Sequence, residues 1–511
     1  MNDRTKKASL NIVFGIINRV IITIIDFAVR TYIIRYFGLD LLGLNALFVN
    51  IIQCLSLAEL GMSQVLIFSF YKPLAENNNK KVNALVIFYK KIYSKIALAV
   101  LVMALCIIPF LDNMLDTSIP FGQVVIIFFL FVIETCSSYL FVYKIAVLLA
   151  DQKSYIVSLY SGIIYLISAV LQLMAIVFFR NYILYMLIKI LFGILNNFYI
   201  SRVATKTYHL EEKTIELEKS ERKNIYDIVK AGFVYKICAI LLNSTDNIIL
   251  SLVSGIRAVG LLSNYTNIIT ILSSYIVLIF QSFTAGIGNL VVVESREKKR
   301  EVFEKILYMS HWFSIVFPLS ILFLINDFIQ LWVGEEYILG NDTVILRAFV
   351  MYLSMIMQPI FVFREALAMY CKTKYVMLTA AIINIITSLI LGEYYGVNGV
   401  LLGTVIAMIT TYVWYEPWLL YKDYFDMNSK RYFKLLLKNV VRFVWIGIII
   451  QCLCKYIMVE SWASWILKGT VVFGVINILL LVLDHKNIYF IFYKNTIIQA
   501  IRKRVRWSNG E

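Results

Sequence analysis

The sequence has few charged side chains for its length. Asp, Glu, Lys and Arg make up 16% of its 511 residues, whereas 60% are apolar and the mean hydropathy is +0.79. A soluble domain of ordinary composition has about a quarter of its residues charged, so a polar surface cannot be built from so few. Apolar stretches recur from end to end, among them VLVMALCIIPFL and VVIIFFLFVI. We therefore expect a polytopic membrane protein whose main solvent is lipid.

The sequence also lacks the groupings that carry catalytic, metal or nucleotide chemistry. Its seven cysteines lie mostly inside apolar runs, at spacings that fit no metal site. Its three histidines, His209, His311 and His485, are far apart, and His311 beside Trp312 is expected to be a packed side chain. No Gly-rich phosphate-binding loop is present, and the acidic loop INDFIQLWVGEEYILGND is too short for a catalytic domain. We expect no catalytic residue, no metal site, no cofactor and no enzymatic activity.

The net charge of +16 does not indicate a nucleic-acid partner, because the charges alternate with the apolar runs. Lys and Arg gather in one set of connections, including ESREKKREVFEK, while the alternate set, including LDNMLDTSIPFG, has acids but no Lys or Arg. The positive-inside rule therefore places both termini in the cytoplasm. The start, MNDRTKKASLNIVFG, resembles that of a signal peptide, but the apolar run continues without a cleavage site, so we expect a retained first helix.

The apolar pattern predicts an all-α fold of about fourteen transmembrane helices, at about 20 residues per crossing. They are expected at 10–36, 41–70, 84–111, 119–148, 154–179, 182–202, 226–253, 258–290, 301–325, 343–371, 375–394, 398–421, 438–458 and 463–483. The polar stretch HLEEKTIELEKSERKN is expected to be a cytoplasmic linker. The predicted domains are an N-terminal lobe at 1–205, the linker at 206–225, a C-terminal lobe at 226–424, and two further helices with a basic tail at 425–511.

Two stretches 217 residues apart share one spacing of glycine and asparagine. The stretch YFGLDLLGLNALFVN has Gly38, Gly43 and Asn50, and SGIRAVGLLSNYTN has Gly255, Gly260 and Asn267. Turn chemistry explains each glycine alone, since glycine tolerates positive φ at a helix end, but it does not explain the shared spacing. We infer a duplication of six helices, whose copies share one orientation and form two parallel lobes with a cavity between them. Both hairpins are expected in the gate region at the outer face.

Several charged residues lie inside the predicted spans. A charge at mid-membrane costs roughly 2.5–3.5 kcal/mol on insertion scales, so it normally faces a wet cavity or a partner. The first helix has Arg19, Asp26 and Arg30 on one face. The other charged and polar candidates of the spans are Glu59, Lys236, Asn243, Asp246, Gln281, Arg347 and Arg364. Arg30 has the strongest case, because it is deep and its planar donor fork suits phosphate oxygens.

These residues also have structural interpretations. Asp26 and Arg30 are one helical turn apart and can neutralise each other. Glu59 and Asp246 can be interhelical hydrogen-bond partners, and the polar stripe that includes Gln281 can serve packing. Three cations near helix ends are expected to extend to the membrane interface, namely Arg35, Lys144 and Arg180.

The run RTYIIRYFGLDLLGLNALFVNIIQCLSLAELGMSQVLIFSFYKPLAENN resembles the opening of bacterial polysaccharide flippases. These form the Wzx-type, lipopolysaccharide-biosynthesis branch of the multidrug/oligosaccharidyl-lipid/polysaccharide exporter (MOP) superfamily. The resemblance continues through NSTDNIILSLVSG, VGLLSNYTNIIT, GIGNL and YYGVNGVLLGT, and thus covers essentially the whole chain. It implies a fourteen-helix protein of the bacterial inner membrane that moves an undecaprenyl-pyrophosphate-linked oligosaccharide outward by alternating access, for O-antigen, capsule or similar surface polysaccharide.

The resemblance also implies partners and ligands. The expected partners are the lipid-linked oligosaccharide, membrane lipids and other polysaccharide-assembly proteins. The expected cavity cations that meet the pyrophosphate are Arg30, Arg19, Lys236, Arg364 and Arg347. The carboxylates expected to bind Na⁺ or carry a proton are Asp26, Glu59, Glu134 and Asp246.

Two other transport functions remain open. Multidrug exporters of the same superfamily use membrane carboxylates to bind cationic drugs, but they usually have twelve helices. A lipid II flippase of the peptidoglycan pathway has fourteen helices and a cationic cavity, but its arginine pattern does not map cleanly onto this sequence.

Overall fold

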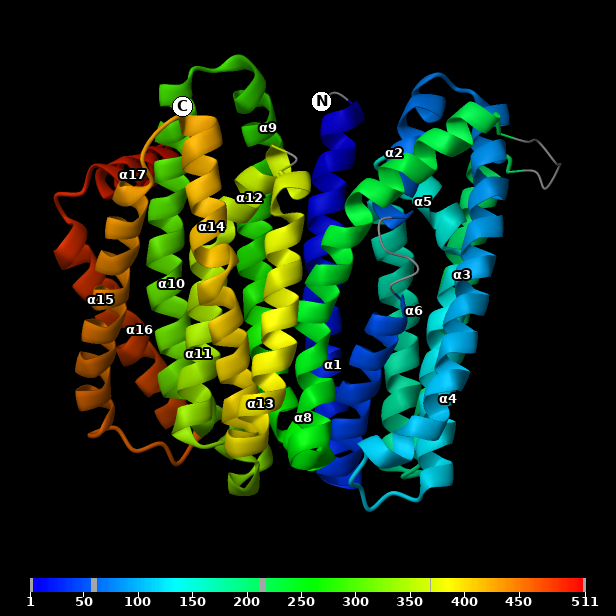
Figure 1. Ribbon diagram of the computed structural model, residues 1–511, viewed down its shortest axis with the longest axis horizontal. Coiled ribbons are helices and arrows are strands. Elements are labelled where there is room, and N and C mark those ends of the chain that lie inside the picture. Colours follow the sequence, from blue (N-terminus) through cyan, green and yellow to red (C-terminus); the bar gives the residue numbers. More distant parts are fainter. Residues whose placement is uncertain (1–2, 57–61, 211–216, 368, 509–511) are drawn as a thin grey trace. The chain divides into compact units, whose positions relative to one another are not determined.

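The structure, a computed structural model, describes residues 3–56, 62–210, 217–367 and 369–508, and its regular structure in these ranges is helical (Figure 1). The predicted all-α fold is therefore confirmed. The helices are α1 (Asp3–Leu55), α2 (Met62–Ala75), α3 (Asn79–Met114), α4 (Phe121–Tyr139), α5 (Val142–Ala150), α6 (Ser154–Val177), α7 (Tyr182–Tyr208), α8 (Lys219–Gln281), α9 (Thr284–Val293), α10 (Arg296–Val333), α11 (Asn341–Ile356), α12 (Gln358–Ala366), α13 (Tyr370–Thr410), α14 (Tyr412–Leu420), α15 (Lys430–Cys454), α16 (Trp462–Asp484) and α17 (Ile488–Ser508). Two short elements complete them, the 3₁₀ turn η2 (Glu335–Tyr337) and the π-helical turn η3 (Tyr421–Phe425).

Eleven helical segments in the described ranges are long and apolar enough to cross a bilayer. Three of them, Asn18–Leu55, Ile240–Gly288 and Lys372–Phe425, have 38, 49 and 54 residues, far more than the roughly 20 that one crossing needs. Each of these three contains a glycine with non-helical torsion angles that divides it into two segments. Division of these three at their glycines gives fourteen helical segments in the described ranges, the number of crossings that the sequence predicts, and the chain is a multi-pass membrane protein.

The dividing glycines are Gly38, Gly255 and Gly396, whose φ values are 76°, 78° and 56°. A positive φ with an extended ψ is open essentially to glycine alone, because a Cβ would clash with the backbone. Gly38 has ψ −170° and Gly255 has ψ 171°, so the two glycines, 217 residues apart, have nearly the same conformation. The two predicted hairpins thus share one backbone geometry, whereas their role in a gate stays a prediction.

Some elements differ from the predicted helices. The segment expected at 343–371 is divided into α11 and α12 at Met357, where Pro359 cannot donate a backbone hydrogen bond in the first turn of α12. The segment expected at 119–148 is likewise divided into α4 and α5. The C-terminal part, expected to be only a basic tail, begins with the helix α17, because its aromatic residues pack against α10.

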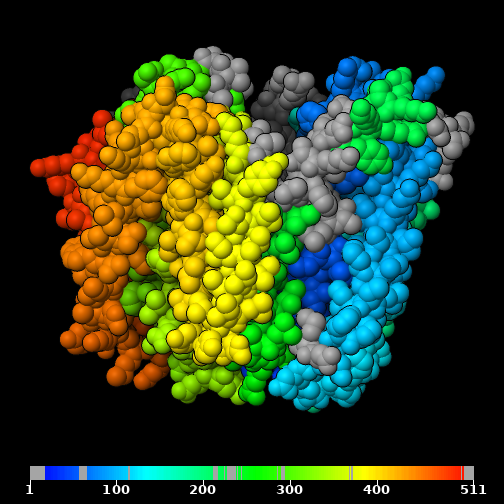
Figure 2. All heavy atoms as spheres, viewed as in Figure 1, coloured from blue at the N-terminus to red at the C-terminus, as the bar shows by residue number. Residues whose placement is uncertain are grey.

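The chain forms two compact units, and α8 and α13 contribute to both. Unit 1 comprises residues 1–263 and 381–400, and unit 2 comprises 264–380 and 401–511. In unit 1, α1 packs on α6, α6 on α7 and α3 on α4. The light-blue and cyan atoms of α3 and α4 form one face of this unit (Figure 2). The duplication predicted from the sequence, with its linker near 206–225, stays a prediction.

Two groups of contacts mark the opposite ends of unit 1. At one end Lys81, in the first turn of α3, forms an ion pair with Glu221, in the first turn of α8. Beyond the other end of α3, Ser118 donates to Asp40 from its backbone N at 3.2 Å and from its hydroxyl at 2.7 Å. Asp116 lies beside Gly255 there, so both hairpins and the loop LDNMLDTSIPFG share this end. The two sets of connections that the charge pattern distinguishes are thus separated within this unit.

Unit 2 has an aliphatic core in which the last two spanning helices pack on α10. Each of the three helices contributes residues one turn apart, namely Ile315 and Leu319 of α10, Ile446 and Ile450 of α15, and Val472, Ile476 and Leu480 of α16. Side chains four residues apart lie on the same helix face, so each helix presents one apolar stripe to the others. Helices α15 and α16 are therefore integral to unit 2.

Candidate functional site

Arg30 is half-buried in the apolar first segment of α1. Its Nη2 donates a hydrogen bond to the hydroxyl of Ser263 at 2.6 Å, and that hydroxyl donates to the Gly260 carbonyl at 2.7 Å. Ser263 is buried and follows the second hairpin on α8. The most strongly predicted cation is therefore positioned by the segment that carries the repeated glycine motif.

The two hairpins contact each other through the repeated glycines. A Cβ added to Gly43 would overlap the carbonyl oxygen of Ile256, and one added to Gly260 would lie 2.5 Å from the carbonyl oxygen of Leu39. Leu39 and Ile256 are 217 residues apart, as Gly43 and Gly260 are. The contact is therefore reciprocal, each glycine meeting the residue that follows the kink glycine of the other hairpin.

A second polar cluster lies within unit 1, on α1, α4, α6 and α7. Asp26 accepts a hydrogen bond from the hydroxyl of Tyr165. Lys189 lies with its Nζ 3.0 Å from Glu134 Oε1, and both Lys189 and Arg19 act electrostatically on the Asp26 carboxylate. Carboxylates held in apolar spans near a hydroxyl and cations are the groups that membrane transporters use to bind a small cation or exchange a proton.

In unit 2 the predicted cation Arg364 is paired with a carboxylate. Its Nη1 lies 2.9 Å and 3.0 Å from the two oxygens of Glu416, and its guanidinium lies 4.5 Å from the ring centre of Phe361. The side chains of Arg364 and Glu416 are 12% and 0% exposed. Arg364 thus reaches an anionic ligand only by sharing its guanidinium with Glu416.

The remaining predicted residues have varied surroundings. Arg347 is half-buried and donates to the hydroxyl of Thr266 at 3.0 Å. Asn50 donates to the Ala46 carbonyl of its own helix at 2.7 Å, a local side-chain to backbone bond of the kind common for asparagine. The others with described side chains are either exposed, as Arg19 and Gln281, or half-buried, as Asp246 and Asn267. Glu59 and the side chains of Lys236 and Asn243 lie outside the described part of the structure.

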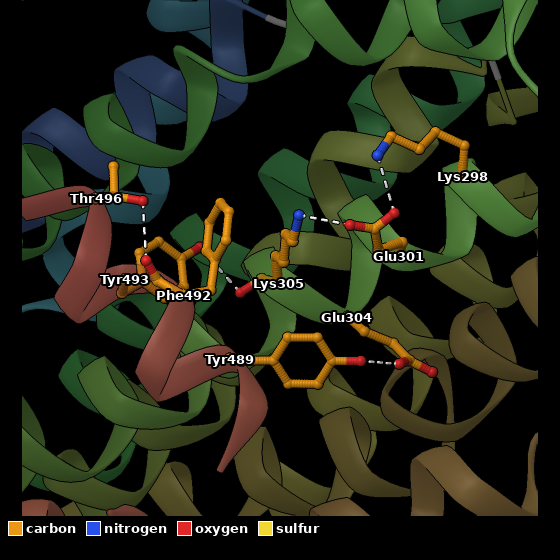
Figure 3. Close-up of polar contacts among 8 residues, drawn as sticks. All are labelled: Lys298, Glu301, Glu304, Lys305, Tyr489, Phe492, Tyr493 and Thr496. Carbon is orange, nitrogen blue, oxygen red and sulfur yellow. Dashed lines mark hydrogen bonds and ion pairs between the residues drawn. The ribbon is translucent and has the colours of Figure 1, made fainter. Parts of the chain in front are cut away.

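A carboxylate that sequence reasoning did not single out connects three helices of unit 2. Glu304 of α10, whose side chain is 4% exposed, meets Arg300 at 3.1 Å and Arg431 of α15 at 3.2 Å. It also accepts a hydrogen bond from the hydroxyl of Tyr489 of α17 (Figure 3). Burial and this carboxylate raise the pKa of Tyr489 to about 12, so the phenol keeps the proton that it donates. Tyr493 adds a hydrogen bond to the Lys305 carbonyl at 3.1 Å, which fixes α17 on α10.

Lys189 and Glu416 are two charged residues of the spans that the sequence analysis did not single out. Each is the lone charge of an apolar run, in YILYMLIKILFG and VWYEPWLL. A complete list of isolated charges in the spans would have found both. Their partners, Glu134 and Arg364, were already among the candidates.

Comparisons with known proteins bear on the fold. No family model matches the sequence, and no curated protein matches it. Among solved structures, the lipid II flippase MurJ in an inward closed conformation is similar, with a TM-score of 0.64 and 17% identity, over 92% of this chain and 98% of that chain. An inward-facing multidrug resistance MATE family transporter of the MOP superfamily is similar with a TM-score of 0.59 and 11% identity. This similarity covers 77% of this chain and 93% of that chain. The MATE multidrug transporter DinF-BH is similar with a TM-score of 0.56 and 15% identity, over 84% of this chain and 98% of that chain.

These similarities extend over nearly the full length of the compared proteins. At 11–17% identity they establish the fold, which is the one that MOP-superfamily transporters adopt. The chain is therefore a multi-pass membrane protein whose fold is similar to that of these transporters, and it forms two compact units.

Proposed function

We propose that this chain is an alternating-access flippase of the bacterial cytoplasmic membrane. Its substrate is an undecaprenyl-pyrophosphate-linked oligosaccharide, which it moves from the inner to the outer leaflet for surface polysaccharide assembly. Both termini are cytoplasmic, and the chain acts as a transporter rather than an enzyme. The fold shared with a lipid II flippase supports a lipid-linked substrate.

The observation that carries the proposal is the position of Arg30. An arginine inside an apolar span is costly, and Arg30 is held in its span by a hydrogen bond to the hydroxyl of Ser263. A guanidinium presents five donors in a planar fork, which matches the oxygens of a phosphate. In this function Arg30 binds the pyrophosphate, with Arg19, Lys236 and Arg347 as further cavity cations. Arg364 contributes less, because Glu416 already balances it.

The hairpin geometry gives alternating access a mechanical element. Gly38 and Gly255 reverse the chain at one end of unit 1, and Gly43 and Gly260 bring the two hairpins into backbone contact there. Opening this contact would release substrate at the outer face, while Arg30 lies deeper on the same α1. We therefore assign the glycines and Asn50 and Asn267 to the outer gate.

A second candidate function is export of cationic drugs, favoured by the cluster of Asp26, Tyr165, Glu134 and Lys189. Carboxylates in a membrane cavity attract cations, and two of the similar structures are MATE multidrug transporters. The pairing of Glu134 with Lys189 removes one of the two carboxylates as a drug ligand. We therefore assign this cluster to coupling by Na⁺ or a proton.

The experiment is deletion of the gene in its native cells, followed by extraction of lipid-linked glycans and assay of surface polysaccharide. The proposed function predicts that a lipid-linked oligosaccharide accumulates on the cytoplasmic side while surface polysaccharide is lost. Hypersensitivity to cationic drugs with normal surface polysaccharide would establish the exporter instead. Accumulation of lipid II with lysis would establish a peptidoglycan flippase.

A further inference from the structure

Unit 1 has a lysine-lined groove that none of the contacts described above involves. It has a volume of about 490 Å³ and lies between α3, α5 and the residues that follow α7. Its lining residues are Val86, Ile87, Lys90, Lys91, Ser94 and Lys95 of α3, Tyr143 and Lys144 of α5, and Leu210. Four of these nine side chains are cationic and none is acidic, so the groove is a site of concentrated positive charge.

Three lysines of unit 1 outside this groove have carboxylate partners. Lys81 pairs with Glu221, Lys153 with Asp151 and Lys189 with Glu134. Within the described part of unit 1, by contrast, Lys91, Lys95 and Lys144 have no carboxylate within ion-pair distance. Because Lys144 comes from a different helix, the lysines converge on one space rather than only extending from one helix end. The convergence favours a common anionic ligand.

The position of the groove along α3 indicates what kind of anion it fits. Lys95 is the last charged residue before an uncharged stretch at 96–111, which rises roughly 24 Å and nearly spans the hydrocarbon core. The exposed side chains that follow on the same face, at helical spacing, are Leu98, Val102 and Leu105, which are 62%, 51% and 50% exposed. Along α3 the lysines that attract an anion are thus followed directly by apolar side chains. A phospholipid has the same order, with an anionic headgroup followed by an acyl chain.

We propose that this groove binds the phosphate headgroup of an anionic phospholipid, with an acyl chain along the apolar stripe of Leu98, Val102 and Leu105. The lipid stays bound to the protein and is not the transported substrate. The buried side chains of Val86, Tyr143 and Leu210 form the floor of the groove, so the site has depth as well as charge. A free phosphate would use the lysines but not the stripe, which is why the occupant is a lipid.

The test uses the purified full-length protein in detergent, titrated with phosphatidylglycerol or with phosphatidylcholine and followed by native mass spectrometry. The wild type should bind one phosphatidylglycerol saturably and phosphatidylcholine at least tenfold more weakly. Lys91→Gln/Lys95→Gln should lower the phosphatidylglycerol affinity at least tenfold, since each lysine near an anionic lipid contributes a factor of roughly five. Both lysines are exposed, so their replacement leaves the packing intact. Lys144→Gln, on the second helix, should lower the affinity separately.

The matched control is Lys80→Gln/Lys455→Gln, which removes two exposed lysines outside the groove and should bind like the wild type. Three results would overturn the proposal. One is equal loss of lipid in the control, which would mean nonspecific attraction to the basic surface. Another is unchanged affinity of both groove variants. The third is complete displacement of the lipid by millimolar inorganic pyrophosphate, which would make the groove a site for a free anion.

Discussion

Gly43 and Gly260 occupy equivalent positions in two hairpins that cross in backbone contact. A Cβ on Gly260 would lie 3.3 Å from the backbone nitrogen of Gly43 and 2.5 Å from the carbonyl oxygen of Leu39. A Cβ on Gly43 would overlap the carbonyl oxygen of Ile256. Backbone atoms cannot rotate away as a side chain can, so the close approach depends on glycine at both positions.

The crossing predicts that Gly43→Ala and Gly260→Ala destabilise this end of unit 1. Each methyl group forces the hairpins apart, at a cost of about 1–3 kcal/mol, typical of overpacking. The measurement is thermal unfolding of the purified variants, together with transport. Gly193→Ala is the control, because a Cβ there meets nothing within 4 Å. If Gly43→Ala and Gly193→Ala lowered the thermal stability equally, the result would contradict the close crossing of the two hairpins.

The pair of Arg364 and Glu416 predicts strong coupling between two buried charges. Arg364→Met or Glu416→Leu alone leaves an uncompensated charge and should destabilise the protein by about 3–5 kcal/mol. The double variant Arg364→Met/Glu416→Leu should recover most of that loss, because no unpaired charge remains. A double-mutant cycle on chemical unfolding measures the coupling. If the two single substitutions lower the free energy of unfolding additively in the double variant, Arg364 and Glu416 are not coupled.

The cluster around Asp26 predicts that coupling depends on its carboxylate. Asp26→Asn should abolish the dependence of transport on a Na⁺ or proton gradient, because the amide can no longer bind the cation or take up the proton. Tyr165→Phe, which removes only the hydrogen bond to Asp26, should weaken this dependence. Transport by reconstituted protein with and without each gradient is the measurement. Asp112→Asn, at an exposed position, is the control, and unaltered coupling in Asp26→Asn would rule the cluster out.

Glu304 predicts that α17 is docked by a buried network. Glu304→Ala removes the acceptor of Tyr489 and leaves Arg431 without this partner, so hydrogen exchange of α17 should speed up at least roughly tenfold. Glu301→Ala is the matched control, since the Glu301 side chain is 43% exposed and its ion-pair partners are Lys298 and Lys305 of its own helix (Figure 3). Exchange in α17 that is equally slow in both variants would contradict the docking.

The spans and the hairpins were predictable because they depend on local properties. Apolar length sets where the chain crosses, and the requirement for positive φ marks Gly38 and Gly255. Their equal spacing to Gly43 and Gly260 also indicated equivalent hairpins before any contact between them was visible.

The partners of the buried charges were not predictable in the same way. Arg364 and Glu416 are 52 residues apart, and Arg30 and Ser263 are 233 apart, on helices whose neighbours the hydropathy pattern does not specify. Periodicity reports the face and depth of a side chain but not the helix opposite it. The docking of α17 escaped prediction for the same reason, since its contacts with Glu304 and Lys305 are tertiary.

The most direct test of the proposed function is flipping of an undecaprenyl-pyrophosphate-linked oligosaccharide in proteoliposomes that contain wild type, Arg30→Ala or Arg30→Lys. The wild type should move the substrate across the bilayer, and Arg30→Ala should be at least roughly a hundredfold slower, because the pyrophosphate loses its deep guanidinium. Arg30→Lys should recover part of the rate, since it keeps the charge but loses the fork. Flipping at the wild-type rate by a well-folded Arg30→Ala variant, or no flipping by the wild type, would contradict the proposed function.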